Sequence, residues 1–461
     1  MMRLWVAVWA ARLVGLVSRI SGRGGSSLPG MVARRIDPLV LSKLVSRLSK
    51  GVILLTGTNG KTTTAALAAS LLQCDGHPIV HNQAGANLIV GLTSTMVQAE
   101  KWRVYPRAAL ALLETDEASM PRAGQETHPR AIVVTNFFRD QLDRYGELST
   151  TVGMVRKAIS QMASDGWLVL NADDPQVAFL GQDQQHVIYF GLDLPVNATL
   201  EETGDDVVDA RFCPRCGQAL RYRQRYYAHL GDYSCPNCGW SRPIPHWTAT
   251  LWDKQSHIVT VRHGNDLMEL PMNMPGIYNV YNLVGAVAAA MTQGLPAHEM
   301  GRCLEHFEPA FGRMEQVMIR DHQIWLALVK NPVGFTQVLE AVGDWPESSK
   351  WALIAINDRY ADGQDVSWLW DVDFETLGPR LGIDQWWVSG MRAYDMALRL
   401  KYAGIPDEKV HVVENPNIAL DMMVDQSTRT VTIYVMPTYT ALLDLRQHLT
   451  QKGYTRHFRE G

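Results

Sequence analysis

The sequence predicts an α/β protein built on mainly parallel sheets. Short apolar runs that end in polar residues alternate with helical stretches, the pattern of parallel strands that crossover helices join and cover on both faces. Apolar residues make up 46% of the 461 residues and charged residues 20%, so the chain is globular and long enough for about three domains. Its 43 basic and 47 acidic side chains give a net charge of −4, which argues against a dedicated nucleic-acid binder.

The chain divides at two changes of pattern. We expect an N-terminal helical segment over residues 1–50, a central domain over 51–314 and a C-terminal Rossmann-like α/β domain over 315–461. A stretch rich in Cys, Arg and Tyr, at about 205–245, looks inserted in the central domain. The strands predicted before it are Val52–Thr56, Ala109–Glu114, Ala131–Asn136, Trp167–Asn171 and Val187–Phe190.

Further elements follow the insertion. We expect β structure over 248–261 and 266–271, and an Ala-rich helix over 279–293. The C-terminal strands would be Ile324–Val329, Trp351–Ile356, Gln385–Val388 and Val431–Met436. The C-terminal helices would be Thr336–Val342, Ala393–Tyr402 and Thr440–Lys452.

The N-terminus is the most apolar part of the chain. Arg12 interrupts the run Leu4–Val17 well short of the ~20 residues that span a bilayer. A signal peptide is the competing interpretation, but the arginines recur and no clean small-residue cleavage site follows. We therefore expect an amphipathic helix that packs on its own domain, while peripheral contact with a membrane surface stays open.

A glycine-containing loop follows the first predicted strand. Gly57-Thr-Asn-Gly-Lys-Thr-Thr-Thr64 lies between that strand and a helix, where backbone N–H groups and the helix N-terminus bind phosphate and Lys61 adds a charge. Thr62 is a candidate Mg²⁺ ligand. The strict P-loop spacing is not met, because its first glycine position is Leu55. We predict a phosphate site rather than an ordinary glycine turn.

Carboxylates follow another predicted strand. Glu114-Thr-Asp116-Glu117 ends the second run, at the sheet edge where open α/β proteins bind ligands. Such residues are also common in solvated loops, but beside a phosphate loop they favour Mg²⁺ binding.

The insertion carries a metal-binding pattern. Cys213-Pro-Arg-Cys216 and Cys235-Pro-Asn-Cys238 are two knuckles, each followed by glycine, which together predict a structural four-thiolate Zn²⁺ site in a reducing compartment. Two disulfides are the alternative. The arginines and tyrosines between the pairs are interpreted as the solvated face of a ribbon, not as a nucleic-acid site.

Several segments occur in the order seen in the Mur ligases, and the chain resembles that family. They are Gly57–Thr64, Asn82–Asn87, Thr135–Asp140 with Asp143–Gly146, Asn171–Pro175, Asn279–Asn282 and Gly312–Glu315. The resemblance implies ATP and Mg²⁺ as cofactors and activation of a carboxylate as an acyl phosphate. It also implies a nucleotide and metal site in the central domain, made of Gly57, Thr58, Asn59, Gly60, Lys61, Thr62, Thr63, Glu114, Asn279, Asn282 and Arg313.

Two positions depart from the Mur ligase pattern. Gln141 stands where these ligases usually have His, and Lys330 replaces the His of an Ala-His-Asn-Pro motif. We infer from Lys330 that the attacking amine is handled differently here.

A polar loop after the strand Trp351–Ile356 carries Asp358, Asp362 and Asp365. On composition alone it is an Asx-rich turn without chemistry. Together with the four-cysteine ribbon and the segment Asn331–Phe335, however, it resembles the MurT family, the ligase-like subunits of lipid II isoglutaminyl synthase.

That resemblance implies a function. The family amidates the α-carboxylate of D-glutamate in the lipid II stem peptide with ammonia from glutamine, which a separate GatD-type amidotransferase hydrolyses. Asp365 would complete the catalytic site of that partner, and the heterodimer would work in the cytoplasm or at the inner face of the membrane. Cys74 and Cys303 are interpreted as small buried hydrophobes, because neither has a nucleophile motif with a paired His. An amino-acid ligase and a non-catalytic nucleotide-binding scaffold are the alternatives.

Overall fold

A computed structural model describes nine stretches of the chain, residues 2–20, 27–74, 78–82, 86–99, 108–140, 148–195, 209–309, 312–344 and 349–455. The chain forms two compact units. The first comprises Met1–Phe138, Glu147–Asn273 and Asn279–Glu308, and the second comprises Arg139–Gly146, Met274–Tyr278 and Pro309–Gly461. Each unit has its own sheet and its own core.

The first unit is built on a nine-stranded sheet in the order β11-β10-β9-β6-β5-β4-β1-β3-β2. From β2 to β9 all neighbours are parallel, and β10 and β11 extend the sheet antiparallel. The central strands β1, β3 and β4 are almost wholly buried, because helices cover both faces. The strands are β1 Gly51–Thr56, β2 Ile79–His81, β3 Leu110–Glu114, β4 Ala131–Val134, β5 Trp167–Asn171, β6 Val187–Leu192, β9 Trp247–Asp253, β10 Ile258–His263 and β11 Asp266–Pro271.

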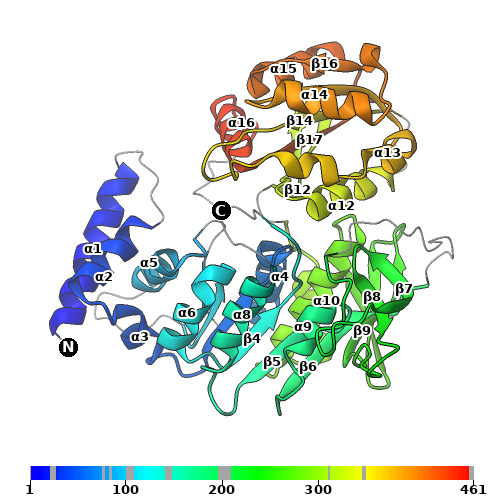
Figure 1. The fold of residues 1–461 in the computed structure, drawn as a ribbon. Helices are drawn as coiled ribbons and strands as arrows, with labels where there is room; N and C mark the ends of the chain where they lie inside the picture. Colours follow the sequence, from blue (N-terminus) through cyan, green and yellow to red (C-terminus); the bar gives the residue numbers. More distant parts are fainter. Residues whose placement is uncertain are drawn as a thin grey trace. The chain divides into compact units, whose positions relative to one another are not determined.

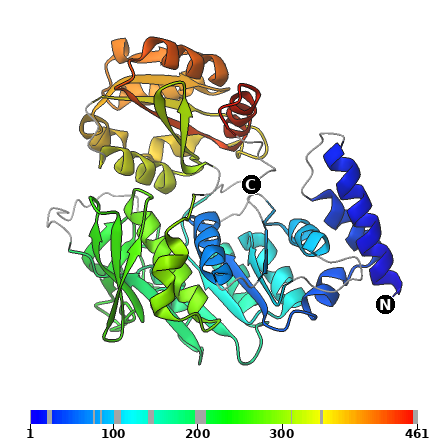
Figure 2. The ribbon, with the colours of Figure 1, turned by 180° about the vertical axis from the view of Figure 1, so that it is seen from behind.

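Two groups of helices enclose this sheet. Side chains of α5, α6, α8 and α9 form one hydrophobic core with alternate residues of the strands. The helices α4 and α10 lie over the opposite face, as Figure 2 shows from behind. The helices are α4 Lys61–Gln73, α5 Ile89–Ala99, α6 Met120–Thr127, α8 Leu148–Ile159, α9 Pro175–Phe179, α10 Ile277–Met291 and α11 Met300–Leu304, with short 3-10 turns η1 Glu117–Ser119 and η2 Ala297–Glu299.

Three helices precede the first strand and belong to the first unit. They are α1 Met2–Ile20, α2 Leu28–Ile36 and α3 Val40–Val45. Helix α1 packs on α2, and α2 packs on α5 (Figure 1). Arg34 of α2 also forms a two-pronged ion pair with Glu126 of α6, at 2.6 and 2.8 Å. The N-terminal segment is therefore attached to the central domain by both apolar and ionic contacts.

The inserted ribbon is a two-stranded antiparallel hairpin, β7 Arg221–Tyr227 and β8 Leu230–Ser234. Its strands do not join the large sheet. The prediction of a solvated face is only half right: Arg221 and Arg223 are exposed, whereas Tyr227 is buried and Tyr222 and Tyr226 are partly buried. The tyrosines are inside because the hairpin packs against the unit that carries it.

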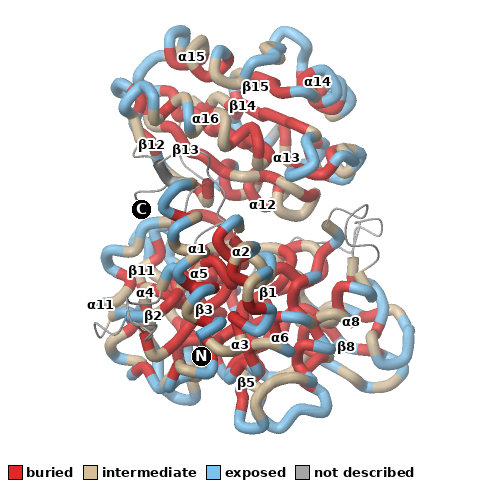
Figure 3. Tube along the Cα trace, turned by 90° about the vertical axis from the view of Figure 1, so that its left-hand side faces the viewer, coloured by how far each residue is buried: buried red, intermediate tan, exposed pale blue. Residues whose placement is uncertain are grey.

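The second unit has a six-stranded sheet in the order β12-β13-β17-β14-β15-β16. Its neighbours are parallel except for the hairpin β12–β13 at one edge. Figure 3 shows the buried strands inside and the exposed segments around them. The strands are β12 Arg313–Ile319, β13 His322–Ala327, β14 Lys350–Ala355, β15 Ile383–Ser389, β16 Val410–Val412 and β17 Thr432–Pro437; the helices are α12 Pro332–Gly343, α13 Phe374–Leu377, α14 Ala393–Tyr402, α15 Pro416–Gln426 and α16 Tyr439–Gln451, with 3-10 turns η3 Ser367–Asp371, η4 Gly378–Arg380 and η5 Asp407–Lys409.

The predicted α/β class with parallel sheets is confirmed. In the two large sheets the prediction missed β2, β12 and β16, which all lie at sheet edges, and it gave no strand ranges for the ribbon, where β7 and β8 form. Edge strands are short or half exposed, so their apolar runs are weak. Within the residues described, no helix combines the length and the apolar character that a membrane crossing requires.

Candidate functional site

The site begins at the loop between β1 and α4. Gly57 and Gly60 have positive φ values of 128° and 83°, a region that favours glycine. A Cβ atom at Gly57 would lie 2.2 Å from Thr135 Oγ1, and one at Gly60 would lie 2.1 Å from Asn282 Oδ1. Both positions therefore require glycine for space as well as for conformation.

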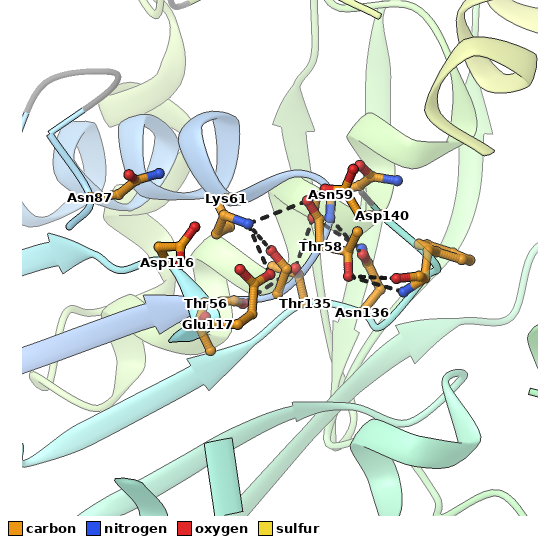
Figure 4. Close-up of polar contacts among 12 residues, drawn as sticks. Thr56, Thr58, Asn59, Lys61, Asn87, Asp116, Glu117, Thr135, Asn136 and Asp140 are labelled. Carbon is orange, nitrogen blue, oxygen red and sulfur yellow. Dashed lines mark hydrogen bonds and ion pairs between the residues drawn. The ribbon is translucent and has the colours of Figure 1, made fainter. Parts of the chain in front are cut away.

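Neighbouring segments hold this loop in place (Figure 4). Thr58 N donates to the Asn136 carbonyl at 2.9 Å, and Asn59 N donates to the Asn136 side chain at 2.9 Å. The Thr135 hydroxyl donates to the Asn59 carbonyl at 2.8 Å. The segment after β4 thus fixes the loop without using the first turn of α4, where Thr62 is half-buried and Thr63 is buried.

Lys61 is buried at the start of α4. Its Nζ donates to the carbonyls of Gly57 and Thr58 and pairs with Glu117 Oε1 at 2.9 Å. Burial alone would lower the pKa of Lys61, but the carboxylates of Glu117, Asp116 and Glu114 outweigh it and raise the pKa above its usual value. The ammonium group is therefore kept charged inside the protein.

The carboxylates come from the end of β3 and the turn after it. Glu114 is 3% exposed. Asn82 Nδ2 donates to the Glu114 carbonyl and Asn82 Oδ1 accepts from Glu114 N, both at 2.8 Å. Asn87 Nδ2 donates to the Glu114 carboxylate at 3.3 Å. Glu114 is predicted as a Mg²⁺ ligand from the sequence, and the structure adds Glu117, whose carboxylate contacts Lys61 because the chain turns into η1 soon after the strand.

The asparagines of α10 reach the same loop. Thr64 Oγ1 donates to Asn282 Oδ1 at 3.2 Å, and Asn282 Nδ2 donates to Asn279 Oδ1 at 3.0 Å. Both asparagines are buried. The structure therefore brings Asn279 and Asn282 to the glycine loop, whereas Arg313 belongs to the second unit, at the start of β12.

Two aspartates after β5 connect the ribbon to this region. Asp174 caps α9 through two backbone N–H groups, and its other oxygen accepts from Phe137 N at 2.8 Å and lies 3.2 Å from His229 Nε2. Phe138 packs on His229, with ring centroids 4.7 Å apart, and its N donates to Thr58 Oγ1 at 3.0 Å. The ribbon hairpin thus reaches the glycine loop through a single intervening segment.

Asp173 forms a second connection. It accepts from Arg242 Nε at 2.6 Å, Tyr281 Oη at 2.6 Å and Leu192 N at 2.9 Å. Complete burial raises the pKa of Asp173 despite these partners. Tyr281 lies between Asn279 and Asn282 on α10, so this carboxylate anchors the helix that carries them. From the sequence, Asp173 and Asp174 are only part of the family-like segment Asn171–Pro175, and the Asp-Pro pair is the one local signal, since it is typical of a helix start.

The four ribbon cysteines come together. Their Sγ atoms all lie within 4.8 Å of one another, and Gly217 and Gly239 have the positive φ values that close each knuckle. Four thiolates at this separation are the donor set of a tetrahedral Zn²⁺ site. The residues present therefore fit the ion, and neither knuckle forms a disulfide.

Cys74 and Cys303 form a disulfide with each other, so the interpretation of both as separate buried hydrophobes is wrong. Cys74 follows the last residue of α4, and Cys303 lies in α11. The two are 229 residues apart in sequence, and only the packing of α11 on α4 brings them together.

The loop after β14 holds its three aspartates differently. Asp362 is buried and accepts from the Thr440 N and hydroxyl at 2.7 and 2.6 Å, and burial raises its pKa. Asp358 pairs with Arg392 at 2.6 Å. Asp365 is exposed and accepts a local hydrogen bond from Ser367 N at 2.8 Å. The side-chain and backbone bonds from Ser367 lower the pKa of Asp365.

Lys330 lies at the end of β13, and its Nζ pairs with Asp140 Oδ2 at 2.5 Å within the second unit. Asn331 then caps α12 by accepting from Gly334 N at 2.8 Å. Gln141 and the segment Asp143–Gly146 lie outside the described residues. The lysine that replaces a family histidine is therefore held by a carboxylate.

Comparisons with known proteins identify related chains. The MurT ligase C-terminal model matches residues 328–442, and the Mur ligase middle domain model matches residues 55–208. The MurT subunit of lipid II isoglutaminyl synthase (glutamine-hydrolyzing) from Staphylococcus aureus strain N315 is 33% identical over 98% of both chains. The corresponding subunit from Streptococcus pneumoniae R6 is 34% identical over 96% of this chain and 95% of that one.

Solved structures show the same fold. A pseudomurein peptide ligase type C from Methanothermus fervidus superposes with a TM-score of 0.68 at 20% identity, over 88% of this chain and 79% of that one. A crystal structure of MurF from Acinetobacter baumannii superposes with a TM-score of 0.63 at 16% identity, over 91% of this chain and 79% of that one. At these identities the likeness concerns the fold alone.

Proposed function

Since this chain belongs to the family of MurT subunits of lipid II isoglutaminyl synthase, we propose that it is the ligase subunit of such an enzyme. It amidates the α-carboxylate of D-glutamate in the stem peptide of lipid II to D-isoglutamine, in peptidoglycan synthesis. The observation that carries the proposal is the buried, charged Lys61 in a glycine loop beside three carboxylates.

ATP is the proposed energy source, bound at the loop Gly57–Thr63. The first turn of α4 supplies N–H donors for phosphate oxygens, whereas the N–H groups of Thr58 and Asn59 hold the loop to Asn136. Lys61 adds a positive charge that the nearby carboxylates keep in place. Asn279 and Asn282 support the loop from α10, and Arg313 is proposed as a further nucleotide contact.

Mg²⁺ is the proposed metal, held by Thr62 and Glu114. Carboxylate and hydroxyl oxygens suit this ion, and Glu114 is kept in place by Asn82 and Asn87. Bound Mg²⁺ offsets the negative charge that gathers on the phosphates during transfer.

The proposed reaction has two steps. An oxygen of the glutamyl α-carboxylate attacks the γ-phosphorus of ATP, so that ADP leaves and an acyl phosphate forms. The nitrogen of ammonia then attacks the acyl carbon, phosphate leaves, and the amide remains after loss of a proton. Lys61 stabilises the charge on the transferred phosphoryl group in the first step.

A GatD-type amidotransferase is the proposed source of ammonia. Asp365 lies in the loop after β14 and is exposed; among the described residues it accepts a hydrogen bond from Ser367 in its own turn, whereas Asp358 and Asp362 are engaged within the unit. An exposed, ionised carboxylate can reach the catalytic residues of another protein and complete their site. The heterodimer is proposed to work in the cytoplasm, where ATP is available.

The ribbon is proposed to bind a structural Zn²⁺ through Cys213, Cys216, Cys235 and Cys238. Four protein ligands leave no position for substrate, which favours a structural over a catalytic ion. The bound ion would stiffen the ribbon hairpin. That hairpin carries His229 and is followed by Arg242.

Lys61→Ala tests the function. With the partner, glutamine, ATP and lipid II, we expect ADP release and amidation to fall by about two to three orders of magnitude, while the complex with the partner stays intact. The control is Lys157→Ala, which removes an exposed lysine of α8 and should leave the rate unchanged. Amidation that survives in Lys61→Ala would support a scaffold, and ADP release that depends on an amino acid instead of glutamine would support an amino-acid ligase.

A further inference from the structure

Helix α1 has two apolar faces, and only one of them is used by the fold. Leu4, Ala7, Val8 and Ala11 are 0–2% exposed and belong to the core of the first unit. The other face carries six large apolar side chains that are 38–82% exposed: Met2, Val6, Trp9, Leu13, Leu16 and Val17. The first unit therefore leaves one side of its outermost helix uncovered by described residues (Figures 1 and 2).

The six side chains form one continuous stripe. Their spacing of four, three, four, three and one residues matches the 3.6-residue repeat of a helix, so they share one face along the whole length of α1. A helix that merely covers a domain has polar residues on its outer face. We refer to these six residues as the outer stripe.

The sequence of the N-terminal segment is basic up to the buried Asp37, which Arg3 of α1 stabilises electrostatically. Residues 1–36 contain six arginines and no acidic residue. The guanidinium of Arg12 lies 5.9 Å from the centre of the Trp9 ring, beside the stripe. Arg34, on α2, pairs with Glu126, and Arg3 donates to the Ile36 carbonyl at 2.6 Å. The segment thus combines an exposed apolar stripe with positive charge.

We propose that α1 is a membrane-surface anchor that binds the anionic headgroup layer of a lipid bilayer through the outer stripe. An apolar face with Trp, flanked by arginines, is the composition of a helix that lies in the interface plane, where Trp is favoured. The helix cannot cross the bilayer, and its buried face is already engaged with α2 and the core. The proposal does not depend on the amidation activity.

Vesicle flotation of the purified full chain tests this anchor. Vesicles of phosphatidylcholine with about one-third phosphatidylglycerol should bind the protein, and vesicles of phosphatidylcholine alone should bind it much less. Leu13→Glu should lower binding to the anionic vesicles at least about tenfold, and Arg12→Gln should lower it about fivefold. High salt should weaken the binding further.

The control is Leu267→Glu on β11, because Leu267 and Leu13 are 65% and 63% exposed. This variant should float like the unaltered protein, and unchanged thermal midpoints should show that all variants fold; Leu13→Met should retain binding. Absence of preference for anionic vesicles, or equal loss in Leu267→Glu, overturns the proposal. A soluble dimer that Leu13→Glu dissociates would also overturn it, because the stripe would then bind a second copy.

Discussion

At the scale of single residues, exposure separates the three aspartates of the loop after β14. Asp362 and Asp358 hold the loop to Thr440 and Arg392, and Asp365 remains at the surface with a lowered pKa. A group that must act on another protein needs both properties, access and charge. Sequence spacing alone left all three aspartates equivalent.

Asp365→Asn should therefore separate the two half-reactions. We expect glutamine-dependent amidation with the partner to fall at least about 100-fold, while amidation driven by added ammonium stays within about twofold. The reason is that the ligase site is in place and only the supply of ammonia is lost. Initial rates with each nitrogen source measure this.

The matched control is Asp358→Asn, which removes a carboxylate of the same loop that is engaged with Arg392. It should keep most of its glutamine-dependent rate. An equal loss in both variants would mean that the loop's structure, not the Asp365 carboxylate, is what the partner needs.

Arg242→Met should weaken nucleotide binding from a distance. Arg242 contacts Asp173 and the Leu192 carbonyl, both at 2.6 Å, and its loss leaves the buried carboxylate with neutral donors only. We expect the protein to lose about 3 kcal/mol of stability and KM for ATP to rise more than kcat falls, because Tyr281 then positions α10 less well.

Arg223→Met is the comparison for this variant. Arg223 pairs with Asp232 on the same hairpin but is 80% exposed, so its removal should change stability by less than about 0.5 kcal/mol. If the KM for ATP stays constant in Arg242→Met, the contact between Arg242 and Asp173 does not affect nucleotide binding.

At the scale of elements, three kinds of cross-connection hold the first unit together. A disulfide joins the end of α4 to α11, buried aspartates join the ribbon to β5 and α10, and an ion pair joins α2 to α6. Each connects segments that are far apart in sequence. The disulfide restrains α4, which follows the glycine loop, the aspartates restrain α10, and the ion pair restrains α2.

The ion pair of α2 and α6 should make stability depend on pH. Burial raises the pKa of Glu126, but bonds from Arg34 and Arg122 outweigh it and hold the pKa below its ordinary value of 4.5. The stabilisation is therefore present above pH 4.5 and is lost as the pH falls through the lower, folded-state pKa. Arg34→Met should cost about 3 kcal/mol at neutral pH and progressively less in acid, as measured by urea unfolding.

Arg122→Met provides the contrast, because Arg122 contacts the same carboxylate but is 58% exposed. Its effect should stay below about 0.5 kcal/mol at every pH. A cost for Arg34→Met that does not change with pH would mean that packing of the arginine stem, and not the ion pair, stabilises α2.

At the scale of the whole molecule, the chain forms two compact units with separate sheets. The glycine loop, the carboxylates and the asparagines of α10 all lie in the first unit, and Asp365 and Lys330 lie in the second. A ligand of the first unit should therefore stabilise that unit in particular.

Calorimetry should show this selectivity. We expect ATP with Mg²⁺ at about 100 times its Kd to stabilise the first unit by about 2.7 kcal/mol and to raise the midpoint of one thermal transition. Lys61→Ala should abolish the shift, whereas Asp365→Asn should keep it. A full shift in Lys61→Ala would remove the glycine loop as the nucleotide site.

The sequence by itself determined the features that depend on local order along the chain. Strand, glycine turn and helix follow one another from Gly51 to Gln73 as the spacing predicts, and the two cysteine knuckles were evident as pairs. Most strands of the two large sheets, and the long helices α4, α10, α12, α14 and α16, were predicted within a few residues, because apolar periodicity is a local property. Segment order also indicated the family.

Only the tertiary structure decided which distant side chains meet. It paired Lys61 with Glu117, joined Cys74 to Cys303 and buried His229 against Asp174. Among the described residues it also left one face of α1 uncovered. The three pairings join residues 55 to 229 positions apart in the chain. Such contacts follow from how helices and strands pack, and no local pattern in the sequence encodes them.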